Sequence, residues 1–217
     1  QVDLTLADEK SEVFAPELRN EMNSWTFPLH FIDFETSMVA LPFTRGRKPY
    51  EQVAFQFSAH TLHEDGSMEH HEWIDTNQGV FPNYEFVRQL KAVLEKDDGT
   101  IFKYSPHENT VLNQIKTQML DDDESKYGNL IEWIETITSW NEGGVKGSGY
   151  RNMVDLLQIV RKYYYHPDMG GSNSIKKVLP AVMTGDAVKK NYSRPLDFGT
   201  HLKGRVLWEL NPETGKP

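Results

Sequence analysis

The alternation of apolar and polar residues predicts three strands in the first half of the chain. Residues 29–34 form a short aromatic and β-branched run after Pro28, which is the pattern of a buried strand. Residues 52–60 alternate polar and apolar side chains, as a half-exposed strand does. Residues 64–67 supply a turn before a further strand-like run at 68–75, so we expect these two strands to form an antiparallel hairpin beside the first.

Apolar residues at helical spacing dominate the rest of the chain. The predicted segments are a helix over 83–95, a strand over 100–104, and helices after 106, over 130–140, over 156–165 and from 174 to the residue before Pro180. Beyond Gly185 we find no firm periodicity. The order of three strands, a helix, a strand and a helix predicts an α/β fold.

The length of the chain indicates a single domain. A chain of 217 residues is long enough for one sizeable core. We expect residues 1–26 to be a linker or a short helix that leads into the domain, and residues 27–217 to be the domain itself. The chain begins with Gln1, and residues 211–217 have the composition of an open loop, so we interpret it as a fragment of a protein with an additional domain.

Composition excludes several classes of function. The chain has no cysteine, so disulfides, zinc–thiolate clusters and thiol nucleophiles are excluded. No apolar run approaches the roughly 20 residues that cross a bilayer, so we expect a cytoplasmic protein with no membrane partner. The formal charge of −9 argues against a general nucleic-acid coat protein. It is compatible with a nuclease, because bound cations offset the charge of phosphates.

Two carboxylates lie at the end of the first predicted strand. Asp33 and Glu35 are two residues apart, and side chains at this spacing share one face of a strand, so both can reach one metal ion. Mg²⁺ and Mn²⁺ prefer oxygen ligands, and two such ions can hold the attacking water and the leaving oxygen of a phosphodiester. The same pair also fits ordinary solvent-exposed carboxylates, so the pair alone leaves both interpretations open.

Several stretches taken together resemble one known family. They are residues 31–36 (FIDFET), 104–109 (YSPHEN), 154–157 (VDLL), 164–167 (YYHP) and 171–180 (GSNSIKKVLP). The set is similar to the DEDD superfamily of 3′-to-5′ exonucleases, and in particular resembles an uncharacterised bacterial family of unknown function within it. The resemblance implies an RNase H-like fold, a mixed central sheet of antiparallel hairpin strands plus parallel strands, flanked by helices. It also implies hydrolysis of DNA or RNA at a single-stranded end with two Mg²⁺ or Mn²⁺ ions.

The resemblance assigns roles to four acids. Asp33 would bridge both ions, Glu35 would complete one metal site, and Glu108 would hold the second. Glu108 stands where the superfamily more often has Asp, and its alternative role is a first-turn acid favoured by the helix dipole. Asp155 is a reserve catalytic ligand, and its alternative role is to cap the helix that follows it.

The last acid of the superfamily has no clear match in this chain. Tyr192 and Asp197 have a permissible spacing, but Pro195 between them disfavours a helix. Either the fourth ligand lies in sequence removed from this fragment, or the domain has lost it. We prefer truncation at the C-terminal end, because the chain stops where that helix is expected.

A second cluster predicts a nucleic-acid contact. Ser172 and Ser174 offer hydroxyls at a helix start, and Lys176 and Lys177 add positive charge, which together suit a phosphate. A plain helix cap with solvated lysines is the alternative.

Three functional hypotheses follow from the sequence. The first is a DEDD-type nuclease. The second is a catalytically degenerate nucleic-acid-binding or interaction module on the same fold, which the missing fourth acid motivates. The third is a hydrolase of nucleotides or other small phosphoesters on the same scaffold.

Overall fold

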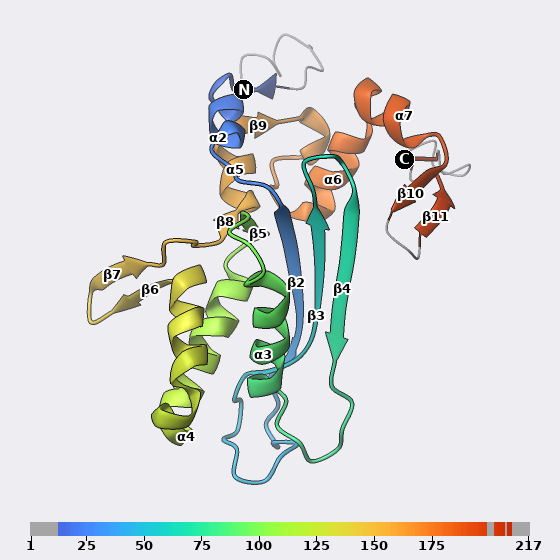
Figure 1. Ribbon diagram of the computed structural model, residues 1–217. Coiled ribbons are helices and arrows are strands. Elements are labelled where there is room, and N and C mark those ends of the chain that lie inside the picture. The colour runs from blue at the N-terminus through green and yellow to red at the C-terminus, as the bar shows by residue number, and fades with distance from the viewer. Residues whose placement is uncertain (1–12, 199–201, 207, 210–217) are drawn as a thin grey trace. The chain divides into compact units, whose positions relative to one another are not determined.

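A mixed five-stranded sheet is the main feature of the computed structural model (Figure 1). Its strands, in the order β4-β3-β2-β5-β8, are β4 (Met68–Ile74), β3 (Val53–Leu62), β2 (Leu29–Ser37), β5 (Ile101–Lys103) and β8 (Val154–Asp155). Strand β3 pairs antiparallel with both β2 and β4, whereas β5 runs parallel to β2. The predicted α/β class, the hairpin and the mixed sheet are therefore confirmed.

The structure describes residues 13–198, 202–206 and 208–209. The predicted leading segment at 1–12 and the predicted open loop at 211–217 lie outside these residues. The chain divides into two compact units, which we call the sheet unit (26–154) and the terminal unit (1–25 with 155–217). Across the described residues, no helix combines the length and the apolar character needed to span a membrane.

Two helices of the sheet unit follow the predicted spacing. They are α3 (Asn83–Leu94) and α4 (His107–Ile137), and a small hairpin of β6 (Ser139–Glu142) and β7 (Val145–Ser148) follows them. Helix α4 is interrupted at Asp123, whose φ of −169° and ψ of 93° are not helical, so it consists of two helical segments. The second segment ends before residue 140, the predicted end, because Trp140 pairs with Gly147 in the hairpin.

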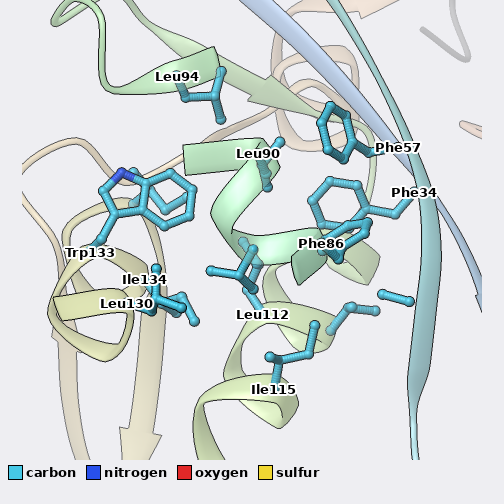
Figure 2. Close-up of a cluster of buried hydrophobic side chains, with 14 of the residues drawn as sticks. Phe34, Phe57, Phe86, Leu90, Leu94, Leu112, Ile115, Leu130, Trp133 and Ile134 are labelled. Carbon is cyan, nitrogen blue, oxygen red and sulfur yellow. The ribbon is translucent and has the colours of Figure 1, made fainter. Parts of the chain in front are cut away.

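Aromatic and aliphatic side chains join these helices to one face of the sheet (Figure 2). The ring of Phe86 from α3 meets the rings of Phe34 from β2 and Phe57 from β3 edge to face, at centroid distances of 4.9 and 5.5 Å. Leu112, in the first segment of α4, is fully buried in the same cluster. Burial of this apolar area stabilises the unit, and it leaves the opposite face of β2 and β3 for polar residues.

Strand β3 contains one extra residue opposite β2. Glu35 pairs with Gln56, but the next residue of β2, Thr36, pairs with Ala54, so Phe55 is the additional residue of a β-bulge. As a result Ala54 and Phe57 both belong to the buried cluster although they are three residues apart.

A buried amide secures the bulged end of β3. Asn83, at the start of α3, is fully buried, and its Oδ1 accepts a hydrogen bond of 2.8 Å from the backbone N–H of Ala54. Its Nδ2 donates to the carbonyl oxygen of Gln52 at 2.8 Å and to Oε1 of Gln118 at 2.6 Å. Asn83 therefore links β3, α3 and α4, and these bonds compensate for the cost of burying its amide.

A second polar cluster holds the start of β2. His30 is 2% exposed, and its Nδ1 lies 2.9 Å from Oγ1 of Thr61, while its Nε2 lies 2.9 Å from Oδ1 of Asp97. Arg151 also donates to Asp97, at 3.2 Å, and to the carbonyl oxygen of Gly99, at 2.7 Å. The cluster therefore joins the start of β2 to the turn that precedes β5.

The terminal unit contains short elements. They are β1 (Val13–Phe14), α2 (Glu17–Asn23), α5 (Leu156–Tyr163), β9 (Tyr164–Tyr165), the 3-10 turn η1 (Pro167–Met169), α6 (Ile175–Met183), α7 (Asp186–Tyr192), β10 (Leu196–Phe198) and β11 (Leu202–Arg205). Helix α5 ends at Tyr163 rather than at 165, because β9 pairs antiparallel with β1. Helix α6 continues through Pro180, where Val178 and Ala181 are buried on either side. Helix α7 occupies a stretch for which no periodicity was found.

We predict that Leu112→Ala lowers the free energy of unfolding by about 2–5 kcal/mol, because it removes a fully buried side chain from a packed core and leaves a cavity. Urea denaturation followed by circular dichroism measures this change. Leu41→Ala is the matched control: Leu41 is 84% exposed, so the same substitution there changes the free energy of unfolding by less than about 0.5 kcal/mol. Equal effects at the two positions would contradict the described core.

We also predict that His30 makes the stability of the protein depend on pH. Burial lowers the pKa of His30 below its ordinary value of 6.5, and the contacts with Asp97 offset this only in part. The unfolded chain therefore takes up this proton at higher pH than the folded protein does, so the free energy of unfolding falls as the pH drops below about 6.5.

Urea denaturation between about pH 7 and pH 5 measures this dependence. In His30→Gln the fall in the free energy of unfolding over this range is smaller than in the natural protein, whatever the absolute stability of the variant. An unchanged pH dependence in the variant would show that His30 is not the group responsible.

Candidate functional site

The two acids of the first motif lie side by side on an open surface of the sheet. In β2, Asp33 and Glu35 are exposed, whereas Phe34 between them is 4% exposed. Both carboxylates therefore project from the same face, as their spacing predicted, and this face is opposite to the one that packs on α3. On the neighbouring strand they pair with Ser58 and Gln56, which are uncharged.

This surface continues across the hairpin, and we call it the open face. On β4 it carries His70, Glu72 and Ile74, all exposed, which pair with His60, Ser58 and Gln56 of β3. The rings of His60 and His70 stack with centroids 4.4 Å apart. Partial burial, followed by the nearby His70, lowers the pKa of His60, so the His60 ring adds little positive charge near neutral pH. The open face is therefore polar and negatively charged around Asp33 and Glu35.

Glu108 has a different environment from the two strand acids. It lies in the first turn of α4 and is only 3% exposed. Leu112, one turn further along, is in the core, so Glu108 points toward the inner side of the helix. The ends of the two elements are neighbours nevertheless, because Oγ1 of Thr36 in β2 lies 3.4 Å from Nε2 of His107. The structure thus brings the end of β2 to the start of α4, where the helix dipole favours negative charge.

Within the described part of the chain, no group of three or more histidine, aspartate or glutamate side chains is arranged to hold a metal ion. Asp33 and Glu35 share the open face, and Glu108 lies in the interior of the adjacent helical turn. The structure therefore brings two of the three predicted metal ligands together on one surface. These carboxylate oxygens are of the kind that divalent cations prefer.

The remaining predicted residues belong to the terminal unit. Asp155 occupies the N-cap position of α5, and its Oδ1 accepts a hydrogen bond of 3.0 Å from the backbone N–H of Leu157, so it does cap this helix. Ser174 occupies the N-cap position of α6, and its N–H donates to Oγ of Ser172 at 3.3 Å. Lys176 and Lys177 follow in the first turn of α6, and both are exposed. The side chain of Ser174 makes no capping hydrogen bond to α6, and the phosphate contact stays a prediction.

The late Tyr and Asp pair does not form the helical motif of the superfamily. Tyr192 is the last residue of α7, and Asp197 lies in strand β10, so Pro195 separates two elements as its restricted backbone predicted.

The loop between β2 and β3, residues 38–52, contains features that the sequence analysis did not assign to a site. Phe43 and Tyr50 are 70% and 64% exposed, and the guanidinium of Arg47 lies 3.8 Å from the ring centroid of Phe81. The available signal was the mixture of aromatic and basic residues, which is typical of surfaces that bind nucleic acids.

One family model matches the chain, that of a domain of unknown function (DUF2779), over residues 30–174. This range begins in β2, includes both acids of the open face and Glu108, and ends at Ser174. No curated protein and no solved structure shows a significant match. The prediction of a domain family of unknown function is thus confirmed, while its link to the DEDD superfamily stays a prediction. Because the matched range exceeds half of the 217 residues, the chain belongs to the DUF2779 family.

Proposed function

We propose that this protein hydrolyses phosphodiester bonds of DNA or RNA at a single-stranded end, with Asp33 and Glu35 as its metal ligands. The observation that supports this most is the position of the two carboxylates: both are exposed on one face of β2, which lies between two other strands. Rigid elements hold functional groups more accurately than loops do. The 3′-to-5′ direction is part of the proposal and follows the resemblance of the motifs.

The strand arrangement is compatible with an RNase H-like scaffold, which is also part of the proposal. Three antiparallel strands in sequence order, β2, β3 and β4, are followed by β5, which runs parallel to β2. Because β5 is parallel to β2, its carboxyl end points the same way as the acidic end of β2. The first turn of α4, which contains Glu108, therefore lies next to the acidic end of β2. The contact between Thr36 and His107 joins the two elements there.

The residues of the open face fit a hard divalent cation. Asp33 and Glu35 would hold Mg²⁺ or Mn²⁺ through carboxylate oxygens, and their adjacent negative charges raise the local cation concentration. A bound cation of this type lowers the pKa of water and offsets charge on the phosphate. Glu108 would contribute negative charge from the neighbouring helical turn. Thr36 orients this turn through His107, because their side chains lie within hydrogen-bonding distance.

A catalytically degenerate nucleic-acid-binding module is the second candidate. The specific observation in its favour is that the described residues contain no assembled group of three metal-binding side chains. Metal titration separates the two candidates: the enzyme shows saturable Mn²⁺ binding that depends on Asp33 and Glu35, whereas the degenerate module does not.

We predict that the protein shortens end-labelled single strands of DNA or RNA in the presence of Mn²⁺, and that Asp33→Asn lowers the rate by at least roughly 100-fold. Removal of the cation with EDTA abolishes the reaction. Denaturing gel electrophoresis of the labelled strands measures both effects. Mononucleotide esters serve as a parallel substrate, and turnover that ignores strand length would favour a small-phosphoester hydrolase instead.

The controls separate loss of chemistry from loss of folding. Because Asp33 is exposed, Asp33→Asn changes the free energy of unfolding by less than about 0.5 kcal/mol. Glu132→Gln is the matched control, since Glu132 is an exposed acid on α4 and lies outside the acidic pair, and it leaves the rate unchanged. Full activity in a well-folded Asp33→Asn protein would refute the assignment of this residue as a metal ligand.

A further inference from the structure

A cavity of about 610 Å³ lies between two loops of the sheet unit. One wall comes from the loop between β2 and β3, residues 38–52, and the other from the loop between β4 and α3, residues 75–82. Ser37, the last residue of β2, and Phe55, the extra residue of the bulge in β3, also line the cavity. The volume falls in the range of roughly 300–1,000 Å³ in which proteins enclose small ligands.

The walls of this cavity are held by hydrogen bonds and by ring contacts. The backbone N–H of Tyr50 donates to the carbonyl oxygen of Val39 at 2.8 Å, which closes the first loop. The hydroxyl of Thr44 donates to the carbonyl oxygen of Val80 at 3.3 Å, which joins the two loops. The stacking of Arg47 over the ring of Phe81 makes a second connection between them. The cavity is therefore a formed feature of the folded unit.

The apolar part of the lining consists largely of side chains that remain in contact with water. Phe43 is 70% exposed and Val80 is 53% exposed, and Phe55 and Phe81 add two further rings. Exposed apolar groups that gather around a hollow indicate a binding surface, because a ligand that covers them removes their area from water. The phenylalanine rings favour a flat ligand with π-faces, and Phe43 is the most exposed of them, whereas Arg47 already covers one face of Phe81.

The charge of the lining favours a neutral ligand. Two cations, Arg47 and Lys48, and two anions, Glu51 and Asp75, line the cavity, so their formal charges cancel. Both cations are already engaged: Arg47 pairs with Asp122, and Lys48 pairs with Asp121 at 3.0 Å. A phosphate would have to compete with these carboxylates for both cations, whereas an uncharged ring does not.

The polar groups of the second loop suit the edge of a heteroaromatic ring. Thr76 and Gln78 line this wall and carry both donors and acceptors. Asn77 is held against the carboxylate of Asp75, because its Nδ2 and its backbone N–H both donate to Oδ1 at 2.8 Å. Mixed donors and acceptors are what nucleobase edges present in return.

The cavity is also adjacent to the acidic pair. Ser37, which lines the cavity, is two residues beyond Glu35 on the same strand, which corresponds to a separation of about 7 Å along β2. The extra residue of the bulge belongs to β3, so β2 itself keeps its alternation and Ser37 faces the same side as Glu35. A single-stranded nucleic acid whose backbone reached Glu35 would thus bring a neighbouring base to the cavity.

From these observations we propose that the cavity binds a purine or pyrimidine base through stacking on its phenylalanine rings, with Phe43 as the main contact. The base can belong to a free nucleoside or to a single strand held at the acidic pair. Only the second source rests on the proposed function, and binding to the cavity itself needs neither a cation nor hydrolysis.

The test measures binding of adenosine and of a short single-stranded oligonucleotide by isothermal titration calorimetry, with the 217-residue chain in EDTA. Loss of one base–aromatic stack weakens binding about 5- to 150-fold, so we expect Phe43→Ala to have an effect of this size. Phe43→Trp, which keeps an aromatic face, retains binding. Leu41→Ala is the matched control, because Leu41 is exposed on the same loop and does not line the cavity.

The outcomes distinguish the two sources and the two proposals. If adenosine binds and its binding depends on Phe43, the cavity is a site for a free base. If only the oligonucleotide binds, and its binding depends on Phe43, the cavity holds a base that belongs to a single-stranded nucleic acid. The proposal is overturned if neither probe binds saturably, or if Phe43→Ala and Leu41→Ala bind equally well. The double variant Asp33→Asn, Glu35→Gln keeps adenosine binding. Absence of hydrolysis in every protein would therefore remove the proposed function and leave the cavity site intact.

Discussion

The two-sided character of strand β2 is the constraint on which the rest of the structure depends. Ile32 and Phe34 are buried against the helices, whereas Asp33 and Glu35, which alternate with them along the strand, are exposed. The strand is hydrogen-bonded on both sides, to β3 and to β5, so it cannot move by one residue without losing both ladders. Such a slip would also bury two carboxylates and expose aromatic rings, which costs several kcal/mol. Packing of the core thus holds the acids in solvent.

Much of this arrangement was accessible from the sequence because it rests on local periodicity. The spacing of Asp33 and Glu35 predicts a shared face whatever the fold around them, and the helical spacing of the apolar residues predicts α3 and both segments of α4. The capping role of Asp155 was one of two predicted alternatives, since its side chain needs only the helix that follows it. These features depend on neighbours within a few positions of the chain.

The features that escaped prediction depend on contacts between distant segments. Tyr164 and Tyr165 leave the helix because β1, about 150 positions earlier in the chain, offers them a strand partner. Helix α6 passes through Pro180 because buried neighbours stabilise it on both sides. The burial of Glu108 and the cavity between two loops likewise follow from tertiary packing. The spacing of residues in a motif does not encode such packing. The sequence therefore predicted the shared face of Asp33 and Glu35 but did not predict the cavity beside these two acids.

The extra residue of β3 has a consequence for comparing members of this family. At Phe55 the phase of the strand changes: buried positions have even numbers before it and odd numbers after it, as Ala54 and Phe57 show. Ala54 donates its backbone N–H to Asn83, and Phe57 contributes a buried ring to the core. The spacing between these two residues is therefore set by the number of residues between them as well as by residue type. A one-residue gap between positions 54 and 57 would mark a relative in which β3 lacks this bulge and its buried positions keep a single alternation.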